Sequence, residues 1–401
     1  MDTNQLFYRT QCMSVLRYIL DVSPIREYTG ALQALSDSPA AFAAAYGALC
    51  QTVYASTDRA QNVVRAIQCC NNPLTAHLDQ PSDETLAAAT FDLETINALL
   101  SLSGDDFLQA AAASFGGSPF SFALPPLSAA APLPFTTGKE LCAYYEHAGY
   151  GPFSAGTFFT VNQDEELVLV EHPDPIRLSD LKGYQLEKDK LISNTVAFLE
   201  NRAANNALLY GDKGTGKSST VKAIANEFAH CGLKIVELSP FLLHRFPMIC
   251  AEAARSPYHI IVFLDDLSFD HEDNQFATLK AFIEGGLTGK PSNLILYATS
   301  NRRHLVRESF ADRTGDEIHA RDTMETITSL SDRFGLEITF SVPDKDDYLY
   351  IVDELADQYG LDLGTDELHL LAERFALRRN GRSPRTARQF IQFQLSQETE
   401  Q

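Results

Sequence analysis

A glycine-rich segment that contains a lysine and a serine, residues 211–218, has the composition of a phosphate-binding loop. Its sequence, GDKGTGKS, follows the pattern G-x-x-x-x-G-K-S. Glycines adopt backbone conformations that other residues avoid, so successive N–H groups can point toward an anion. In this pattern the lysine, Lys217, reaches the β- and γ-phosphates, and the hydroxyl of Ser218 is a ligand for Mg²⁺. The segment therefore predicts a site for a nucleoside triphosphate and Mg²⁺.

The residues around the loop favour this interpretation over a glycine-rich turn without function. An apolar run over 207–210 predicts a buried strand before the loop, and a helical pattern begins near Lys217. The N–H groups at the start of such a helix add to an anion site. We expect the nucleotide to be bound by the loop and the first helical residues: Gly211, Asp212, Lys213, Gly214, Thr215, Gly216, Lys217, Ser218 and Ser219.

Two adjacent carboxylates follow another apolar run, HIIVFLDD, over 259–266. Beside a phosphate-binding loop, Asp265 is the candidate that holds the Mg²⁺ shell, and Asp266 is the candidate general base for the attacking water. The alternative is that the two acids open a turn. Asp266 is shorter than the glutamate that is more usual at this position. The sequence therefore indicates the general base less firmly than the metal ligand.

Three further polar residues complete a set of candidate catalytic groups. Asn301 ends the apolar run 293–301, where an amide can orient water or contact the γ-phosphate. Arg333 precedes the last predicted strand and is placed to act on the site of a neighbouring subunit. From a C-terminal helix, Arg385 can reach the phosphates, with Arg388 as the second choice. For each residue a structural alternative stays open: a helix cap for Asn301, an ion pair for Arg333 and a solvated arginine for the other two.

These residues need an α/β scaffold that brings strand ends together. From residue 207 the pattern alternates between strands and helices, and near-continuous apolar strands indicate a parallel sheet that is covered on both faces. We expect strands at 206–211, 234–239, 259–266, 293–301 and 337–343, with helices at 217–229, 240–255 and 274–287. Three helices follow the last strand, at 344–360, 365–381 and 383–398.

The spacing of apolar residues divides the chain into four parts. Residues 1–115 predict an N-terminal helical bundle, with a docking or scaffolding role preferred to a ligand site. Residues 116–175 predict a linker with a short helix and a strand pair. Residues 176–343 form the predicted nucleotide-binding α/β domain, and 344–401 a C-terminal helical lid.

Composition limits the classes of partner. The net charge is −21, from 32 basic and 53 acidic residues, which disfavours nonspecific DNA binding because that affinity depends on basic residues. The seven cysteines are scattered, and we expect them to be reduced and not to bind zinc. We see no signal peptide and no apolar run near the roughly 18 residues that cross a bilayer. We therefore expect a cytoplasmic protein without a membrane partner.

The order of these parts resembles that of AAA+ ATPases. Residues 211–218, Asp265 with Asp266, Asn301, Arg333 and Arg385 are similar to Walker A, Walker B, sensor 1, the arginine finger and sensor 2. The chain resembles most closely a bacterial family catalogued as domain of unknown function 815, over about residues 175–395. The phrases that carry the resemblance are NALLYGDKGTGKSSTVKAIANEF, FLDDLSF, LKAFIEGGL, YATSNRRHL and SLSDRFGL.

The resemblance implies a fold, cofactors and an assembly. It implies a P-loop NTPase domain with a five-stranded parallel sheet in the order 5-1-4-3-2 and a helical lid. The expected cofactors are ATP and Mg²⁺, and Tyr184 lies in a segment that resembles the adenine-contacting AAA+ N-linker. The expected assembly is a homo-oligomeric ring in which Arg333 acts in trans.

Three functions remain after this reading. We favour a Mg²⁺-dependent ATPase that remodels an unknown protein partner through a self-assembled ring. One alternative is an ATP-switched, DNA-associated protein similar to replication initiators or helicase loaders, which would use the local positive charge of residues 302–304, Arg378, Arg379 and Arg382. The other is a slowly hydrolysing, nucleotide-dependent adaptor. A small-molecule kinase would not need Asn301 and Arg333 at these positions.

Overall fold

The computed structural model describes residues 2–116, 120, 122–267, 279, 283, 291–301, 333–379 and 381–398. The chain forms two compact units, residues 1–155 and 156–401. Each unit has its own hydrophobic core. In the part of the chain that the structure describes, no helix has the length and hydropathy that a membrane crossing requires.

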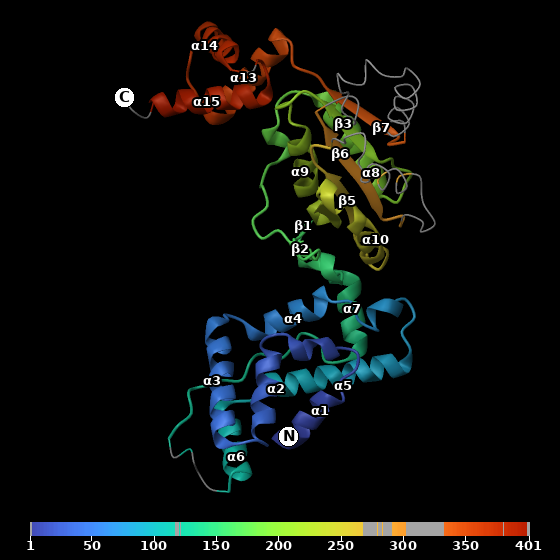
Figure 1. Cartoon of the computed structure of the whole chain (residues 1–401), viewed down its shortest axis with the longest axis vertical. Helices are drawn as coiled ribbons and strands as arrows, with labels where there is room; N and C mark the ends of the chain where they lie inside the picture. Colours follow the sequence, from blue (N-terminus) through green and yellow to red (C-terminus); the bar gives the residue numbers. More distant parts are fainter. Residues whose placement is uncertain are drawn as a thin grey trace, which may run out of the picture. The chain divides into compact units, whose positions relative to one another are not determined.

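The first unit is built from helices around one hydrophobic core (Figure 1). Local sequence explains where helices begin: Ser38 caps α3 by accepting a hydrogen bond from the N–H of Ala41, and Pro39 occupies the first turn. The apolar helix faces meet at buried aromatic side chains such as Phe42 and Phe107. The helices are α1 (Thr3–Gln11), α2 (Ile25–Ala34), α3 (Pro39–Ala55), α4 (Arg59–Cys69), α5 (Asp83–Leu100), α6 (Gly104–Ser114) and α7 (Gly138–Ala148), with short 3₁₀ helices at Arg17–Asp21, Thr75–His77 and Pro152–Ala155.

The segment that we expect to be a linker, 116–175, is divided between the two units. Its described N-terminal part packs on the first unit, where Leu127 and Phe135 are buried. Backbone hydrogen bonds fix it there, from Gly104 N to Leu127 O (2.8 Å) and from Ala130 N to Leu100 O (2.8 Å). Its C-terminal part supplies two strands to the sheet of the second unit.

The described residues of the second unit form a seven-stranded sheet in the order β2-β1-β4-β5-β6-β3-β7. All neighbouring strands are parallel except β1 and β2. The strands are β1 (Phe158–Val161), β2 (Leu167–Leu169), β3 (Ala207–Gly211), β4 (Leu233–Glu237), β5 (His259–Leu264), β6 (Leu294–Ser300) and β7 (Leu336–Phe340).

The expected five-stranded sheet is wrong in its strand number. Counted from β3 to β7 as strands one to five, the central strands lie in the relative order 5-1-4-3-2. The strand pair that we assigned to a linker extends the sheet at β4, where the N–H of Ile235 donates to Thr157 O (2.9 Å). An uncovered edge strand has free N–H and C=O groups, which explains why β4 binds β1.

Both faces of β4, β5 and β6 are buried, as in a parallel sheet that is covered on both sides, whereas Glu337 and Thr339 of β7 are exposed. One face packs Ile261, Phe263 and Tyr297 against helices α8 (Gln185–Leu199) and α9 (Lys217–Glu227). Helix α10 (Phe246–Ala254) follows β4 after a short 3₁₀ segment, Pro240–Arg245. The helix expected at 274–287 lies outside the described residues apart from two positions.

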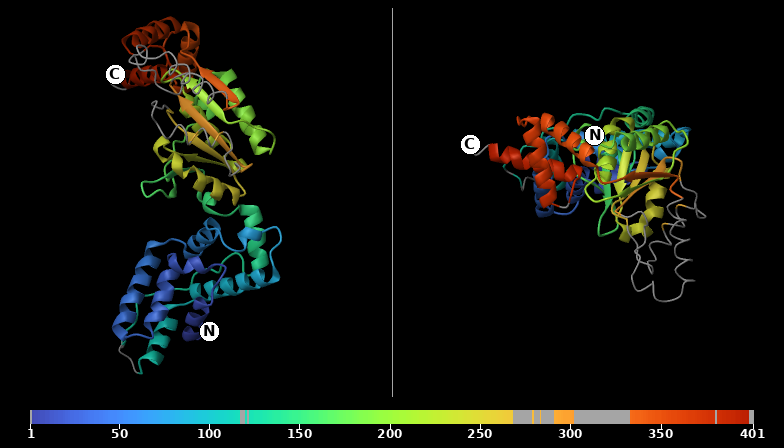
Figure 2. Two further views of the ribbon diagram at one scale, coloured as in Figure 1. Left: turned by 45° about the vertical axis from the view of Figure 1, so that its right-hand side comes forward. Right: turned by 90° about the horizontal axis from the view of Figure 1, so that it is seen from above.

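Three C-terminal helices form a small bundle with a core of its own (Figure 2). They are α13 (Lys345–Tyr359), α14 (Thr365–Arg378) and α15 (Pro384–Glu398), and we call them the lid. Ser383 caps α15 by accepting a hydrogen bond from Thr386 N (3.1 Å). The lid contacts the sheet-bearing part at Lys182–Glu354 (3.8 Å) and at Gly214.

Candidate functional site

The phosphate-binding loop connects the end of β3 to the start of α9, and glycines allow its path. Gly211, Gly214 and Gly216 all have positive φ, of 138°, 82° and 97°. At Gly211 a Cβ atom would lie 2.0 Å from the carbonyl oxygen of Phe340 on β7. Glycine is therefore needed both for conformation and for the close approach of a neighbouring strand.

Lys217, the first residue of α9, lies back across the loop. Its ammonium donates to the carbonyl oxygens of Gly211 (2.8 Å) and Asp212 (2.7 Å) and to Oδ1 of Asn301 (3.2 Å). The residue is buried, and burial lowers its pKa, while the carboxylates of Asp212, Asp266 and Asp265 oppose that shift. The amine is thus held by neutral acceptors, at the place where the sequence pattern predicts phosphate oxygens.

The two candidate metal ligands contact each other directly. Ser218 Oγ donates to Oδ1 of Asp265 at 2.5 Å. The same carboxylate oxygen accepts from Thr299 Oγ1 at 2.6 Å. Mg²⁺ takes oxygen ligands and uses one or two protein groups together with phosphate and water. A serine hydroxyl beside a carboxylate fits that requirement.

Asp266 and Asn301 form the next part of the site. The backbone at Asp266 is left-handed, with a φ of 52°, which is uncommon for a residue with a Cβ atom. Oδ1 of Asp266 accepts a hydrogen bond from Nδ2 of Asn301. Because Asn301 Oδ1 accepts from Lys217, the amide links the P-loop lysine to the candidate base.

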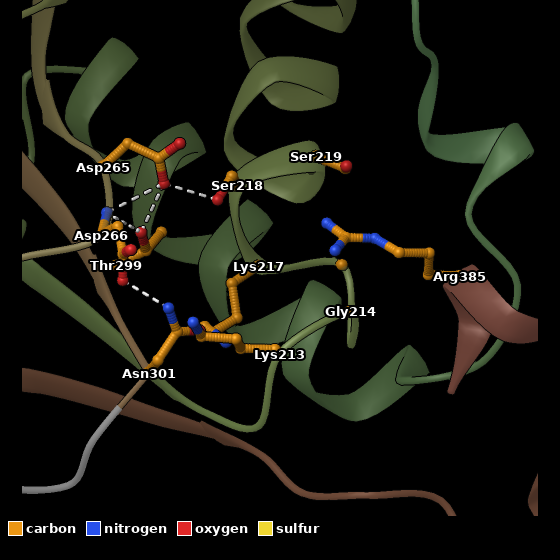
Figure 3. Close-up of a pocket in the computed structure, with 11 residues that line it drawn as sticks. Lys213, Gly214, Lys217, Ser218, Ser219, Asp265, Asp266, Thr299, Asn301 and Arg385 are labelled. Atoms are coloured by element: carbon orange, nitrogen blue, oxygen red, sulfur yellow. Dashed lines mark hydrogen bonds between the residues drawn. The ribbon is translucent and has the colours of Figure 1, made fainter. Parts of the chain in front are cut away.

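These groups line one cavity of about 340 Å³, drawn in Figure 3. Arg385 enters from α15, and its guanidinium points toward the loop from the side opposite the carboxylates. Its backbone N–H donates to Gly214 O at 3.2 Å, which joins the lid to the loop. The cavity is lined by Lys213, Gly214, Gly216, Lys217, Ser218, Ser219, Asp265, Asp266, Thr299, Asn301 and Arg385.

Other predicted site residues lie outside the lining. Gly211, Asp212 and Thr215 stabilise the loop without lining the cavity. The carbonyl oxygens of Gly211 and Asp212 accept hydrogen bonds from Lys217, and the Thr215 hydroxyl donates to Asp212 O (2.9 Å). The second lid candidate, Arg388, instead donates to the carbonyl oxygen of Asp180 (3.4 Å).

Arg333 and Tyr184 are also not part of the lining. Arg333 is exposed, three residues before β7. Tyr184 immediately precedes α8, with its ring 5.2 Å from that of Phe340 and its hydroxyl bonded to Ser341 O (2.5 Å). The residues 302–304 invoked for DNA binding lie outside the described residues.

Sequence reasoning missed Thr299 as a site residue, although strand alternation contains the signal. On β5, Ile261 and Phe263 face α9, so Asp265 continues that face. On β6, Ile295 and Tyr297 also face α9, so Thr299 and Asn301 continue the same face of the sheet. Because Leu264 pairs with Ala298, the next residues along both strands, Asp265 and Thr299, come side by side.

The described residues contain no group of three or more His, Cys, Asp or Glu side chains that would hold a metal ion by itself. A site made of one hydroxyl, one carboxylate and a phosphate-binding loop has a different chemistry. It suits a metal ion that arrives with phosphate oxygens as part of its shell.

Comparisons with known proteins place the chain in a family. No curated protein matches it. Solved structures with similar folds include RuvB of Thermotoga maritima: a point variant has 18% identity and a TM-score of 0.39 over 54% of this chain and 63% of that chain. Another is titled as the RuvB Holliday junction branch migration motor, with 17% identity, a TM-score of 0.38 and the same coverage. Less than two thirds of each RuvB chain is thus matched.

A family model described as "Protein of unknown function (DUF815)" matches residues 154–398. This region contains the whole seven-stranded sheet, the phosphate-binding loop and the three lid helices. It is also more than half of the 401 residues. The protein therefore belongs to the DUF815 family.

Proposed function

We propose that the protein binds ATP with Mg²⁺ in the cavity between the phosphate-binding loop and α15, and hydrolyses it. The observation that carries the proposal is the connected set Lys217–Asn301–Asp266, with Ser218 and Asp265 in the same cavity. Within this cavity the set offers side chains for phosphate binding, for metal binding and for proton transfer. We further propose that hydrolysis remodels a protein partner through a self-assembled ring.

Binding is assigned to the loop and its lysine. The Lys217 ammonium exchanges its contacts with the carbonyls of Gly211 and Asp212 for phosphate oxygens, which are stronger acceptors because they are charged. Lys213 and Arg385 add two cations to the same cavity. Together these groups offset the charge of a triphosphate in a protein whose net charge is −21.

Hydrolysis is assigned to the two aspartates and the asparagine. Asp265 and Ser218 would hold Mg²⁺, which would neutralise the negative charge that develops on the phosphates. Asp266 takes the proton of the attacking water, and Asn301 fixes the carboxylate that does so. The contacts of Ser218 with Asp265 (2.5 Å) and of Asn301 with Asp266 support this division of roles.

The assignment is tested by hydrolysis and binding measurements on three variants. Lys217→Ala is expected to lose ATP binding. Asp266→Asn is expected to bind ATP but to hydrolyse it about 100-fold or more slowly, the usual loss on removing a general base. Asp362→Asn, an exposed carboxylate in the loop between α13 and α14, is the matched control and should behave as wild type.

The result also separates the alternatives. A wild-type turnover no higher than that of Asp266→Asn would exclude hydrolysis by this site and favour the nucleotide-dependent adaptor. The DNA-associated alternative has weaker support, because Arg382 is already paired with Glu373 (2.7 and 2.8 Å). Binding of DNA at low ionic strength in the presence of ATP would revive it.

A further inference from the structure

We propose that Thr299 is a positioning residue of the ATP site, whose hydroxyl orients Asp265 and fixes the turn that presents Asp266. The inference rests on the proposed function, because it assigns a role within the same hydrolytic site. It concerns a residue at the end of β6 that neither contributes a charge nor belongs to the phosphate-binding loop.

Thr299 contacts three consecutive residues on the neighbouring strand end. Its hydroxyl donates to Oδ1 of Asp265 (2.6 Å) and accepts from the backbone N–H of Asp266 (2.9 Å). Its carbonyl oxygen accepts from the backbone N–H of Leu267 (2.7 Å). The side chain is 1% exposed, so water does not compete for these bonds. Thr299 thus holds the whole turn that follows β5.

The turn needs such an acceptor because of its backbone conformation. Asp266 has a φ of 52°, in a region that residues with a Cβ atom adopt at a cost. In this conformation its N–H points at the Thr299 hydroxyl, and its carboxylate reaches Nδ2 of Asn301. Without the hydroxyl, the N–H would keep only a longer contact with Oδ1 of Asp265 (3.1 Å). The direction of the Asp266 side chain therefore depends on Thr299.

The orientation of Asp265 depends on the same hydroxyl. Within the described residues, three donors bond Oδ1 of Asp265: Ser218 Oγ, Thr299 Oγ1 and the Asp266 N–H. If Ser218 and Asp265 held Mg²⁺ together, the Ser218 hydroxyl would itself be a metal ligand. Thr299 would then be the side chain that orients the Asp265 carboxylate without binding the metal ion. Outer groups of this kind commonly change metal affinity or activity by about 10–100-fold.

The hydroxyl can be removed with little change of shape. Thr299→Val replaces it by a methyl group, whereas Thr299→Ser keeps the hydroxyl and loses the methyl. Ser300→Ala is the matched control, because Ser300 is equally buried at the next position and its hydroxyl donates to Leu267 O (2.9 Å) in the same turn. A purely structural effect of losing a hydroxyl at this strand end would appear in both Thr299→Val and Ser300→Ala.

The test measures three quantities on the full-length protein: ATP affinity without Mg²⁺, the Mg²⁺ concentration for half-maximal hydrolysis, and kcat. For Thr299→Val we expect unchanged metal-free ATP affinity, a Mg²⁺ requirement raised about 10-fold and kcat lowered about 10-fold or more. Thr299→Ser should restore the wild-type Mg²⁺ requirement and kcat, and Ser300→Ala should leave the Mg²⁺ requirement unchanged. If Thr299→Val does not fold, comparing Thr299→Ala with Thr299→Ser tests the same loss of the hydroxyl.

The outcomes separate this inference from the proposed function. Active wild-type protein with an unaffected Thr299→Val variant would overturn the role of Thr299 alone. So would a serine variant as impaired as the valine variant, because the methyl group would then be the important part. Failure of the wild type to hydrolyse ATP would overturn the proposed function, and this inference with it.

Discussion

At the scale of single residues, the site is organised by hydrogen bonds that link the candidate phosphate-binding lysine, Lys217, through Asn301 to the candidate base, Asp266. Lys217 is buried and bound to two carbonyl oxygens and an amide oxygen, none of which is charged. Desolvation disfavours its ammonium form, and neutral acceptors compensate only in part. The lowered pKa of Lys217 is the electrostatic consequence. Phosphate oxygens would reverse it, because a negative charge nearby favours the ammonium form.

We expect Lys217 to give the proposed ATP binding a pH dependence. The lowered pKa of Lys217 means that the neutral amine appears below the ordinary lysine value of 10.5. Only the ammonium form binds phosphate well, so affinity should be constant near neutral pH and fall as pH rises through this pKa. At alkaline pH, binding should take up protons, which calorimetry in buffers of different ionisation enthalpy measures.

A lysine that lines the same cavity provides the control. Lys213→Ala should weaken binding but keep the shape of the pH profile, because Lys213 is exposed. An affinity that stays constant up to the ordinary lysine value would contradict the role of Lys217 burial.

At the scale of elements, the phosphate-binding loop is held between β7 and the lid. Gly211 packs under Phe340 of β7, and Gly214 accepts a hydrogen bond from the first turn of α15. A Cβ atom at Gly214 would lie 3.2 Å from Ser383 Oγ and 3.3 Å from the Cβ of Arg385. The loop is thus shaped by two elements that are more than a hundred residues away in the sequence.

The close approach at β7 predicts a large loss of stability for Gly211→Ala. Its Cβ would be 2.0 Å from a backbone oxygen, and φ is 138°, so β7 has to move. We expect the free energy of unfolding to fall by about 2–3 kcal/mol, the upper range for overpacking. Gly360→Ala is the control, with positive φ but no atom within 4 Å of the added Cβ. Equal losses in chemical denaturation of the two variants would contradict the packing argument.

At the scale of the whole molecule, the cavity lacks the arginine that the sequence predicts for catalysis in trans. Arg385 lines the cavity, whereas Arg333 is exposed and outside it. The position of Arg333 follows directly from the strand order. Arg333 precedes β7, and β7 pairs with β3, the strand that leads into the phosphate-binding loop. We propose that Arg333 completes the site of a second copy of the chain.

Mixing variants tests that assembly. Arg333→Ala should bind ATP but lose turnover, and mixing it with Lys217→Ala should partly restore hydrolysis, because the lysine variant still supplies Arg333. Mixing Arg333→Ala with the double variant Lys217→Ala/Arg333→Ala should restore nothing. No restoration in the first mixture, with a monomer by light scattering in ATP, would overturn the trans mechanism.

Much of the candidate site was predictable because its parts are local. The loop is eight successive residues, and Asp265 and Asn301 each end an apolar strand in a sheet that the alternation of strands and helices predicts. The order of the five central strands came from a family resemblance, not from residue spacing. The added strands β1 and β2 were not assigned to the sheet, because nothing in a short strand pair says which edge it joins.

By itself, the sequence determined which chemical groups the protein has and on which side of each strand they lie, since covalent order and periodicity decide both. Only the tertiary structure decided which groups meet. It selected Arg385 over Arg388 for the cavity, placed Tyr184 against Phe340, and brought Thr299 between Asp265 and Asp266. The contacts of Thr299 depend on the register between β5 and β6 and on one left-handed backbone angle at Asp266. Register and backbone angle are settled by packing over the whole sheet, so no short stretch of sequence contains them.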